Sequence, residues 1–322
     1  MRDGGEVPGE ASRLRRRRRP RHRRHRELPG AGAQQLTSAP LSCDLVADLG
    51  STDSVPRAYA VADGDVLLPG PAAQGPWGAT ISGHVVGGIL ARALEQAGAE
   101  QGLVPARLTV DLLRPTLIEP LEVRTTVRRD GRRIRLVDAE VVQNDVVVSR
   151  ASAMFLRRGE HPAGDIWSSP VVMPPLPSDP GPLPEDLMMF VWGYGGDGKS
   201  GGAMAFTEWH DATGPKYAWI RQVRPLVEGE VTTPFVTVAM AADAASATSH
   251  WGTEGLRYIN ADYTLTLARE PVGEYIGLAA TSHNSHEGIA CGAVAVFDAQ
   301  GQIGNAITVG LVNPAESFHP RA

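Results

Sequence analysis

The chain has 322 residues, 42% of them hydrophobic, and 31 basic and 36 acidic side chains give it a formal charge of −5. Its two cysteines, Cys43 and Cys291, form no CxxC pair and adjoin no histidine, which excludes a disulfide scaffold and a cysteine-based zinc site. Apolar runs stay below the roughly 18 residues of a membrane-spanning helix, so no spanning segment is expected.

The charge is divided unevenly along the chain. Residues 1–40 carry eleven arginines against four acids, a net charge of +7, and the other 282 residues carry −12. The segment 13–26 reads RLRRRRRPRHRRHR and offers no apolar surface to bury, so we expect a disordered basic arm over residues 1–45. Such an arm can bind nucleic acid or anionic lipid through phosphates. We favour translated upstream sequence or a species-specific extension, with no nucleic-acid or membrane partner.

One helix and four strands are predicted for residues 46–157. The helix covers 82–95, SGHVVGGILARALE, where Val85, Ile89 and Leu94 recur at helical spacing. The four strand-like runs are 106–115, 120–130, 132–143 and 146–157, with hairpin turns at Asp130-Gly131 and Asn144-Asp145.

A proline-rich segment follows at residues 158–186. It carries eight prolines between Pro162 and Pro184. Proline cannot donate to a sheet ladder, so we expect an extended connector here.

The pattern of one helix and four strands then repeats over residues 187–315, before a tail at 316–322. The apolar, alanine-rich segment 234–251 is the helix, and its four strands are expected at 256–268, 273–284, 286–298 and 302–312, with turns at Glu287-Gly288 and Gln300-Gly301. An α+β fold results, in which a curved antiparallel sheet wraps each helix and the two units form one continuous sheet.

Five sequence segments give the chain a family resemblance. They are GPWGATISGHVVGGILARALEQ (75–96), LLRPT (112–116), AADAAS (241–246), YINADYTLTLAREP (258–271) and GQIGNAITVGLV (301–312). With the order of elements, they make the chain similar to the double-hotdog acyl-CoA thioesterases of the thioesterase II family and its actinobacterial thioesterase-like branch. The resemblance implies a cytoplasmic homo-oligomeric hydrolase of fatty acid metabolism. It would cleave an acyl-CoA, or an acyl thioester on a carrier protein, without metal or other cofactor.

The resemblance also implies a catalytic set. In the family an Asp follows a small-residue helix, a Thr or Asn lies two residues before a second Asp, and a Gln comes from the last strand. These positions correspond to Asp243, Asn260 and either Thr308 or its neighbour Val309. Because Thr reaches less far than Gln, a catalytically degenerate protein that binds acyl chains or acts as an interaction subunit is the alternative.

Thioester chemistry independently favours Asp243, the only acid between Val231 and His250. Burial among apolar residues would raise the pKa of this carboxyl toward a useful range. Asp243 could then orient and deprotonate a water, Asn260 and Thr308 could hold that water, and a helix N-terminus could polarise the carbonyl. The competing interpretation is that Asp243 anchors its helix to the adjacent strand.

The substrate-binding candidates are Trp77, Gly83 and His84, at the start of the first helix. Trp77 is a pocket wall or a core residue. His84 lines an acyl pocket or caps the helix. A hotdog dehydratase would pair such a histidine with an acid, but the helix offers only Glu95, three turns away.

Two further motifs match by letter only. Residues 193–200 fit the phosphate-loop pattern GxxxxGK[ST], and 198–202 fit the nucleophile elbow GxSxG. Each needs a strand before it and a helix after it, and GGAMAFTEWHD after Ser200 opens no helix. Nucleotide binding and serine-hydrolase chemistry are therefore disfavoured. His283 and His286 flank a hairpin turn and are expected to be exposed.

A body with charge −12 does not attract the polyanionic CoA, so a CoA site requires a local basic patch. The candidates are Arg107, Arg114, Arg132, Arg133 and Arg135.

Overall fold

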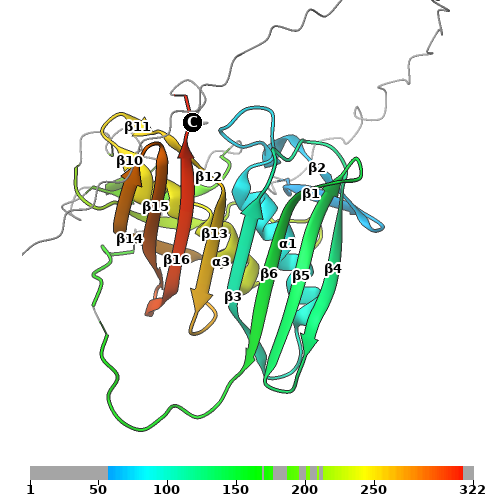
Figure 1. Cartoon of the computed structure of the whole chain (residues 1–322), viewed down its shortest axis with the longest axis horizontal. Coiled ribbons are helices and arrows are strands. Elements are labelled where there is room, and N and C mark those ends of the chain that lie inside the picture. The colour runs from blue at the N-terminus through cyan, green and yellow to red at the C-terminus, as the bar shows by residue number, and fades with distance from the viewer. Residues whose placement is uncertain are drawn as a thin grey trace, which may run out of the picture. The chain divides into compact units, whose positions relative to one another are not determined.

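The computed structural model (Figure 1) describes residues 57–168, 170–176, 187–195, 201–203, 209 and 213–314. The expected basic arm, residues 1–45, and the tail, residues 316–322, lie outside the described residues, as do parts of the connector.

The first half contains the predicted helix and its four strands. Helix α1 spans Gly83–Gly98, and the strands are β3 (Leu103–Leu112), β4 (Leu121–Asp130), β5 (Ile134–Gln143) and β6 (Val146–Arg157). At the β5–β6 turn, Asn144 and Asp145 both have positive φ, 50° and 61°, as a two-residue hairpin of this kind requires. A short hairpin, β1 (Ala60–Asp63) with β2 (Val66–Pro69), precedes the helix and was not predicted.

The second half follows the same plan with two interruptions. The predicted helix 234–251 is two helices, α3 (Pro234–Ala242) and α4 (Ala245–His250), and the predicted strand 256–268 is β12 (Tyr258–Asn260) and β13 (Asp262–Leu267). The last three strands are β14 (Tyr275–His286), β15 (Ile289–Asp298) and β16 (Gly301–Val312), as predicted. Ahead of α3 lie β7 (Phe190–Tyr194), β8 (Gly201–Ala203) and β9 (Tyr217–Arg221), and after α4 the small hairpin of β10 (Trp251–Gly252) and β11 (Gly255–Leu256).

Both halves share one antiparallel sheet in the order β1-β2-β4-β5-β6-β3-β13-β16-β15-β14-β9-β7-β8. Strands β3 and β13 join the halves, with Thr109 opposite Thr264 in their register. Helices α1 and α3 pack against each other behind this sheet (Figure 1). The arrangement is the expected α+β double hotdog.

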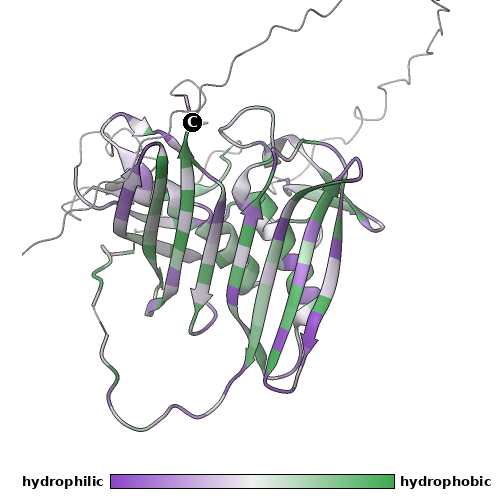
Figure 2. Ribbon diagram, viewed as in Figure 1, coloured by the Kyte–Doolittle hydropathy of each residue, from purple (hydrophilic) through white to green (hydrophobic). Residues whose placement is uncertain are grey.

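Hydropathy changes along the strands (Figure 2), as expected where successive side chains point to opposite faces of a sheet. The inward-facing set packs on α1, whose Val85, Leu90 and Leu94 are fully buried. Between the helices, Tyr263 donates from its hydroxyl to Ala239 O at 2.9 Å and so connects β13 to α3. The core therefore fixes α1 and α3 relative to one another.

Part of the proline-rich connector packs on the second half. The described residues 158–168 and 170–176 contain no helix or strand. Tyr194 donates to Pro175 O at 2.9 Å and Trp219 donates to Pro174 O at 3.0 Å, while Val171 and Met173 contact the same aromatic cluster. Within the described residues, no helix is both long and apolar enough to cross a membrane.

Candidate active site

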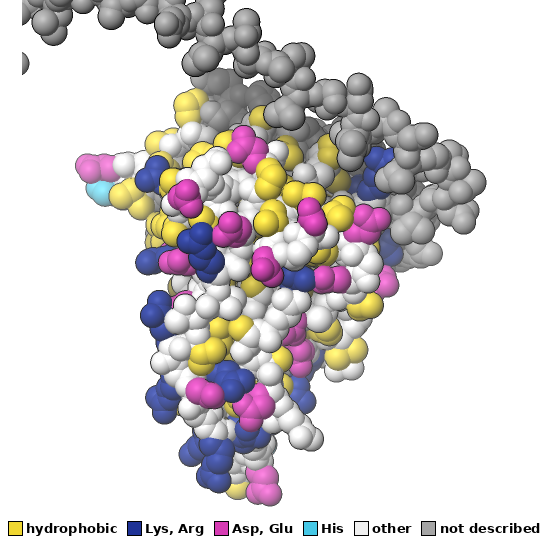
Figure 3. Space-filling view, turned by 90° about the vertical axis from the view of Figure 1, so that its right-hand side faces the viewer, with side chains coloured by type: hydrophobic (Ala, Val, Ile, Leu, Met, Phe, Trp, Pro, Cys, Tyr) yellow, Lys and Arg dark blue, Asp and Glu magenta, His cyan; other side chains and the backbone are white. Residues whose placement is uncertain are grey.

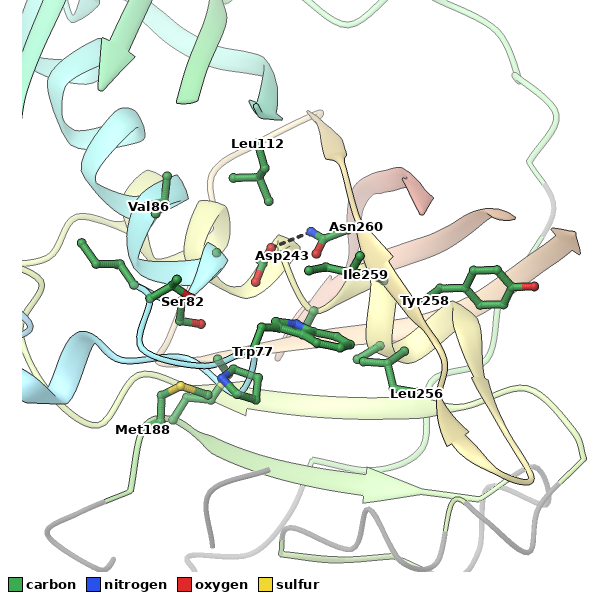
Figure 4. Close-up of a pocket in the computed structure, with 18 of the residues that line it drawn as sticks. Trp77, Ser82, Val86, Leu112, Met188, Asp243, Leu256, Tyr258, Ile259 and Asn260 are labelled. Carbon is green, nitrogen blue, oxygen red and sulfur yellow. Dashed lines mark hydrogen bonds between the residues drawn. The ribbon is translucent and has the colours of Figure 1, made fainter. Parts of the chain in front are cut away.

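A cavity of about 370 Å³ lies where the two halves meet, with mostly apolar walls. Figure 4 shows Val86 and Leu112 on one side of it and Trp77, Met188 and Leu256 on the other. A mostly apolar wall with a few polar groups is typical of a site for an apolar ligand with one reactive end. The polar lining includes Ser82, Asp243 and Asn260, together with Thr80, Arg114, Thr116, Ser246, Thr248 and Tyr258.

Asp243 occupies the break between α3 and α4, and its side chain lines the cavity (Figure 4). Its carboxylate accepts hydrogen bonds from Asn260 Nδ2 at 2.8 Å and from the backbone N–H of His84. The carboxylate is accessible on its cavity side and enclosed by protein elsewhere. This burial raises its pKa from 3.8 to about 6, although both hydrogen bonds act in the opposite direction.

Gly83 allows this contact between the halves. It is the first residue of α1, and a Cβ placed on it would lie 2.5 Å from Asp243 Oδ1. Any larger residue would displace the carboxylate or the helix. The start of α1 also carries the positive end of the helix dipole, which favours the ionised carboxylate.

The structure brings some predicted site residues together and separates others. Trp77 and Gly83 line the cavity with Asp243 and Asn260. His84 is not among the residues that line the cavity: its ring is fully buried and contacts Ser82 Oγ. Its backbone N–H serves Asp243 instead.

Thr308 also lies apart from the cavity. Its hydroxyl donates to the backbone carbonyl of Asp262 at 2.8 Å, and its side chain is buried away from the cavity lining. The residue opposite Asn260 on β16 is Gly310, which has no side chain to contribute. The contact that a Gln would make in the family therefore has no counterpart at position 308.

The structure does not support the dehydratase and phosphate-loop interpretations. Glu95 accepts a hydrogen bond from Thr233 at 2.6 Å and has no contact with His84, so the acid–histidine pair of a dehydratase is not formed. Residues 196–200 of the phosphate-loop pattern lie outside the described residues, and strand β8 begins at Gly201 where that motif needs a helix. His283 is exposed as expected, but its Nδ1 also meets His250 Nδ1 at 2.8 Å, a contact that the sequence did not suggest.

The arginines predicted as a CoA-binding patch do not lie together: Arg114 and Arg135 lie at opposite ends of the first half. Arg114 is exposed and lines the cavity. Arg135 instead contacts Gly98 O, at the last residue of α1, and pairs with Asp130 at 2.7 Å. The 16 residues of α1 separate these ends by roughly 24 Å. In the view of Figure 3, basic side chains gather at the lower end of the molecule, and acidic side chains lie among them.

Sequence reasoning missed Ser82 and most of the apolar wall. The wall comes from segments far apart in the chain, among them Met188, Met189 and Trp251, and no periodicity connects these segments. Ser82 had a signal, because it directly precedes the helix. Among the described residues, no group of three or more His, Cys, Asp or Glu side chains is placed to hold a metal ion.

Comparison with known proteins shows which family models the sequence matches. Residues 73–156 match the model of the acyl-CoA thioesterase N-terminal domain, and residues 177–312 match that of the acyl-CoA thioesterase C-terminal domain. No curated protein sequence matches the chain.

Solved structures share the fold at low sequence identity. The tesB protein of Mycobacterium avium subsp. paratuberculosis is 16% identical with a TM-score of 0.54, over 79% of this chain and 96% of that one. A conserved protein with a hot dog fold from Alicyclobacillus acidocaldarius is 18% identical with a TM-score of 0.59, over the same shares of each chain. The acyl-CoA thioesterase II TesB2 of Mycobacterium marinum is 16% identical with a TM-score of 0.51, over 74% and 90%. With both of its domains matched, the chain belongs to the acyl-CoA thioesterase family and is a thioester hydrolase.

Proposed function

We propose that Asp243 is the general base of this thioesterase and that Asn260 positions it. The observation that carries the proposal is a carboxylate with a pKa of about 6, held by Asn260 in a mostly apolar cavity. A base with this pKa is ionised at neutral pH and still accepts a proton readily. Thr308 has no part in the proposal, because its hydroxyl is used by the backbone of β13.

The reaction follows from this arrangement. The acyl chain occupies the apolar cavity and its carbonyl carbon lies beside a water held by Asp243. Asp243 takes a proton from the water, the water oxygen bonds to the carbonyl carbon, and the C=O electron pair moves onto oxygen. When the C=O bond re-forms, the C–S bond breaks and the leaving thiolate takes the proton from Asp243. The products are a free acid and a thiol, and the carboxylate is restored.

The CoA portion of the substrate would leave the cavity past Arg114. This guanidinium is exposed beside the cavity, where it can meet a phosphate group. The other basic candidates near Arg135 lie at the far end of α1. An acyl-carrier protein is the alternative donor of the thioester, since its arm would follow the same path.

We also propose the division into halves at 46–157 and 187–315, with the connector at 158–186. The β3–β13 junction between two similar units supports it.

A homo-oligomer and a role in cytoplasmic fatty acid metabolism belong to the same proposal. The apolar side chains of Ile307, Val309 and Leu311 are exposed on β16, as suits an association surface. The free thiol of Cys291 suits a reducing compartment. Light scattering that gives a pure monomer would contradict the oligomer.

The test of function is thiol release from a panel of acyl-CoAs of increasing chain length. We expect release by the wild type and loss of it in Asp243→Ala. Tight binding of acyl-CoA without release on any chain length would support the degenerate acyl-binding alternative. Release that is unchanged in Asp243→Ala would refute the assigned base.

A further inference from the structure

The hydroxyl of Ser82 is not used in the usual way for its position. Ser82 is the N-cap residue of α1, with φ −64° and ψ 143°, and a serine there normally accepts a hydrogen bond from the first turn of the helix. Here its side chain makes no such bond. The carboxylate of Asp243 accepts a first-turn N–H instead, that of His84. The Ser82 hydroxyl is therefore available for another role.

Ser82 Oγ instead meets the ring of His84, at 2.7 Å from Nδ1. This ring is fully buried, and Tyr59 packs edge-on against it with ring centroids 5.2 Å apart. Burial and the nearby Arg224 charge lower the pKa of His84 to about 3, so the ring is neutral and carries a single N–H.

The surroundings of Nε2 indicate which of the two ring nitrogens of His84 carries that hydrogen. Within the described part of the chain, Nε2 of His84 is buried and has no hydrogen-bond partner. A buried N–H without an acceptor is rarer and less favourable than an unpaired acceptor. The hydrogen therefore belongs on Nδ1, from where it is donated to Ser82 Oγ. The Ser82 hydroxyl hydrogen is then free to point away from the ring.

Away from the ring lies the cavity. Ser82 is one of its lining residues (Figure 4). Gly83, the next residue, is in contact with Asp243. A hydroxyl donor thus lies one residue from the contact with the base. On β16 the position opposite Asn260 is Gly310, so that strand supplies no side-chain donor there.

We propose that the Ser82 hydroxyl is a catalytic hydrogen-bond donor to the thioester carbonyl oxygen, oriented by the Nδ1–H of His84 as a positioning residue. This inference rests on the proposed role of Asp243 as the base. As water adds to the carbonyl carbon, negative charge develops on the oxygen, and a donor already aimed at it lowers the barrier.

The same pair of residues could be taken for a serine nucleophile and its base. Nucleophilic attack would need Nδ1 of His84 to accept the hydroxyl proton and become positively charged. A fully buried ring with Arg224 nearby opposes that charge. The geometry therefore favours a donor that keeps its proton.

The first experiment measures kcat and KM on an acyl-CoA for Ser82→Ala, Ser82→Gly and Ser82→Thr. We expect Ala and Gly to lower kcat by about 10²- to 10³-fold, the effect of removing one oxyanion donor, with KM nearly unchanged. Thr keeps a hydroxyl and should stay within a few-fold of the wild type. The pH inflection of the remaining activity should stay near pH 6, because Asp243 is untouched. Because the side chain does not cap α1, folding should persist in both truncations, and circular dichroism checks this.

The second experiment observes the ring directly. With ¹⁵N-labelled histidine and His84→Phe for assignment, nitrogen chemical shifts should report a neutral ring with hydrogen on Nδ1. Wild-type kcat in folded Ser82→Ala or Ser82→Gly, a hydrogen on Nε2, or an acyl group found on Ser82 by intact-protein mass spectrometry would each overturn the proposal. If Asp243 is not the base, the Asp243→Asn variant should keep full activity, a result that can be distinguished from the outcomes for Ser82.

Discussion

Replacing Asp243 with Asn should make the enzyme slower and the fold more stable. Asn keeps the size of the side chain but offers one acceptor oxygen, instead of two, to the donors on Asn260 and the His84 backbone. It removes the negative charge and the ability to take a proton. Loss of a general base should reduce kcat/KM by about 10²- to 10⁴-fold.

The gain in stability follows from the raised pKa. A rise from 3.8 to about 6 is about 2 units, or at most about 3 kcal/mol at 1.36 kcal/mol per unit. Water reaching the carboxylate through the cavity reduces this figure, so about 1 to 3 kcal/mol is expected. For an acid with a raised folded-state pKa, the penalty is fully present above pH 6. It fades as the pH falls from 6 toward 3.8, below which the carboxyl is protonated in both the folded and the unfolded state.

Two measurements check this prediction. Thiol release between pH 5 and 9 should show wild-type kcat/KM falling about tenfold per unit below pH 6, as Asp243 becomes protonated. Denaturant unfolding at pH 8 should show Asp243→Asn to be more stable than the wild type, and the difference should shrink at pH 5. Asp262→Asn is the matched control for activity, because Asp262 lies outside the cavity and Asn still accepts from Val309 N–H. A wild-type profile that is flat from pH 5 to 7, or a variant no more stable at pH 8, would refute the reasoning.

Three further substitutions test the site. Asn260→Ala should lower kcat/KM about 10- to 100-fold, since a hydrogen bond to a charged group is lost, and should move the inflection above pH 6; an inflection that stays in place would show that Asn260 does not touch the base. Gly83→Ala should abolish activity in a folded protein, because its Cβ would lie 2.5 Å from the carboxylate, whereas Gly159→Ala meets no atom within 4 Å and should be silent in the same assay. Arg114→Glu should raise KM for acyl-CoA about tenfold yet leave KM for an acyl N-acetylcysteamine thioester, which lacks phosphates, unchanged. Arg132→Glu serves as its control, and equal effects on both thioesters would exclude a phosphate contact.

Local patterns were enough to predict most of the fold. The period of α1, the four-strand runs and turns such as Asn144-Asp145 are properties of neighbouring residues, and they appear where expected. Strands β8 and β9 were missed because they are short and lie near a glycine-rich stretch without alternation. The break between α3 and α4 was also missed. No Gly or Pro lies at the break to mark it, and the contact of Asp243 with the start of α1 comes from the other half of the chain.

The site was predictable to the same extent. Asp243 stood out as a lone acid in an apolar segment, Asn260 came from the family resemblance, and both line the cavity. Thr308 lies two residues from Gly310, the position that faces Asn260, and a side-chain period of two does not distinguish these positions because both point to the same face of the strand. The role of the His84 backbone N–H depends on a tertiary contact, so no side-chain pattern could indicate it.

The approach of α1 to Asp243 has a consequence for how this sequence can change. The residue at position 83 belongs to one half and the residue at 243 to the other, yet the two residues are in close contact. A larger side chain at either position is tolerated only if the other shrinks, so the effects of substitutions at the two positions should not add. The halves resemble one another as repeats, but at positions 83 and 243 their sequences cannot change independently of each other.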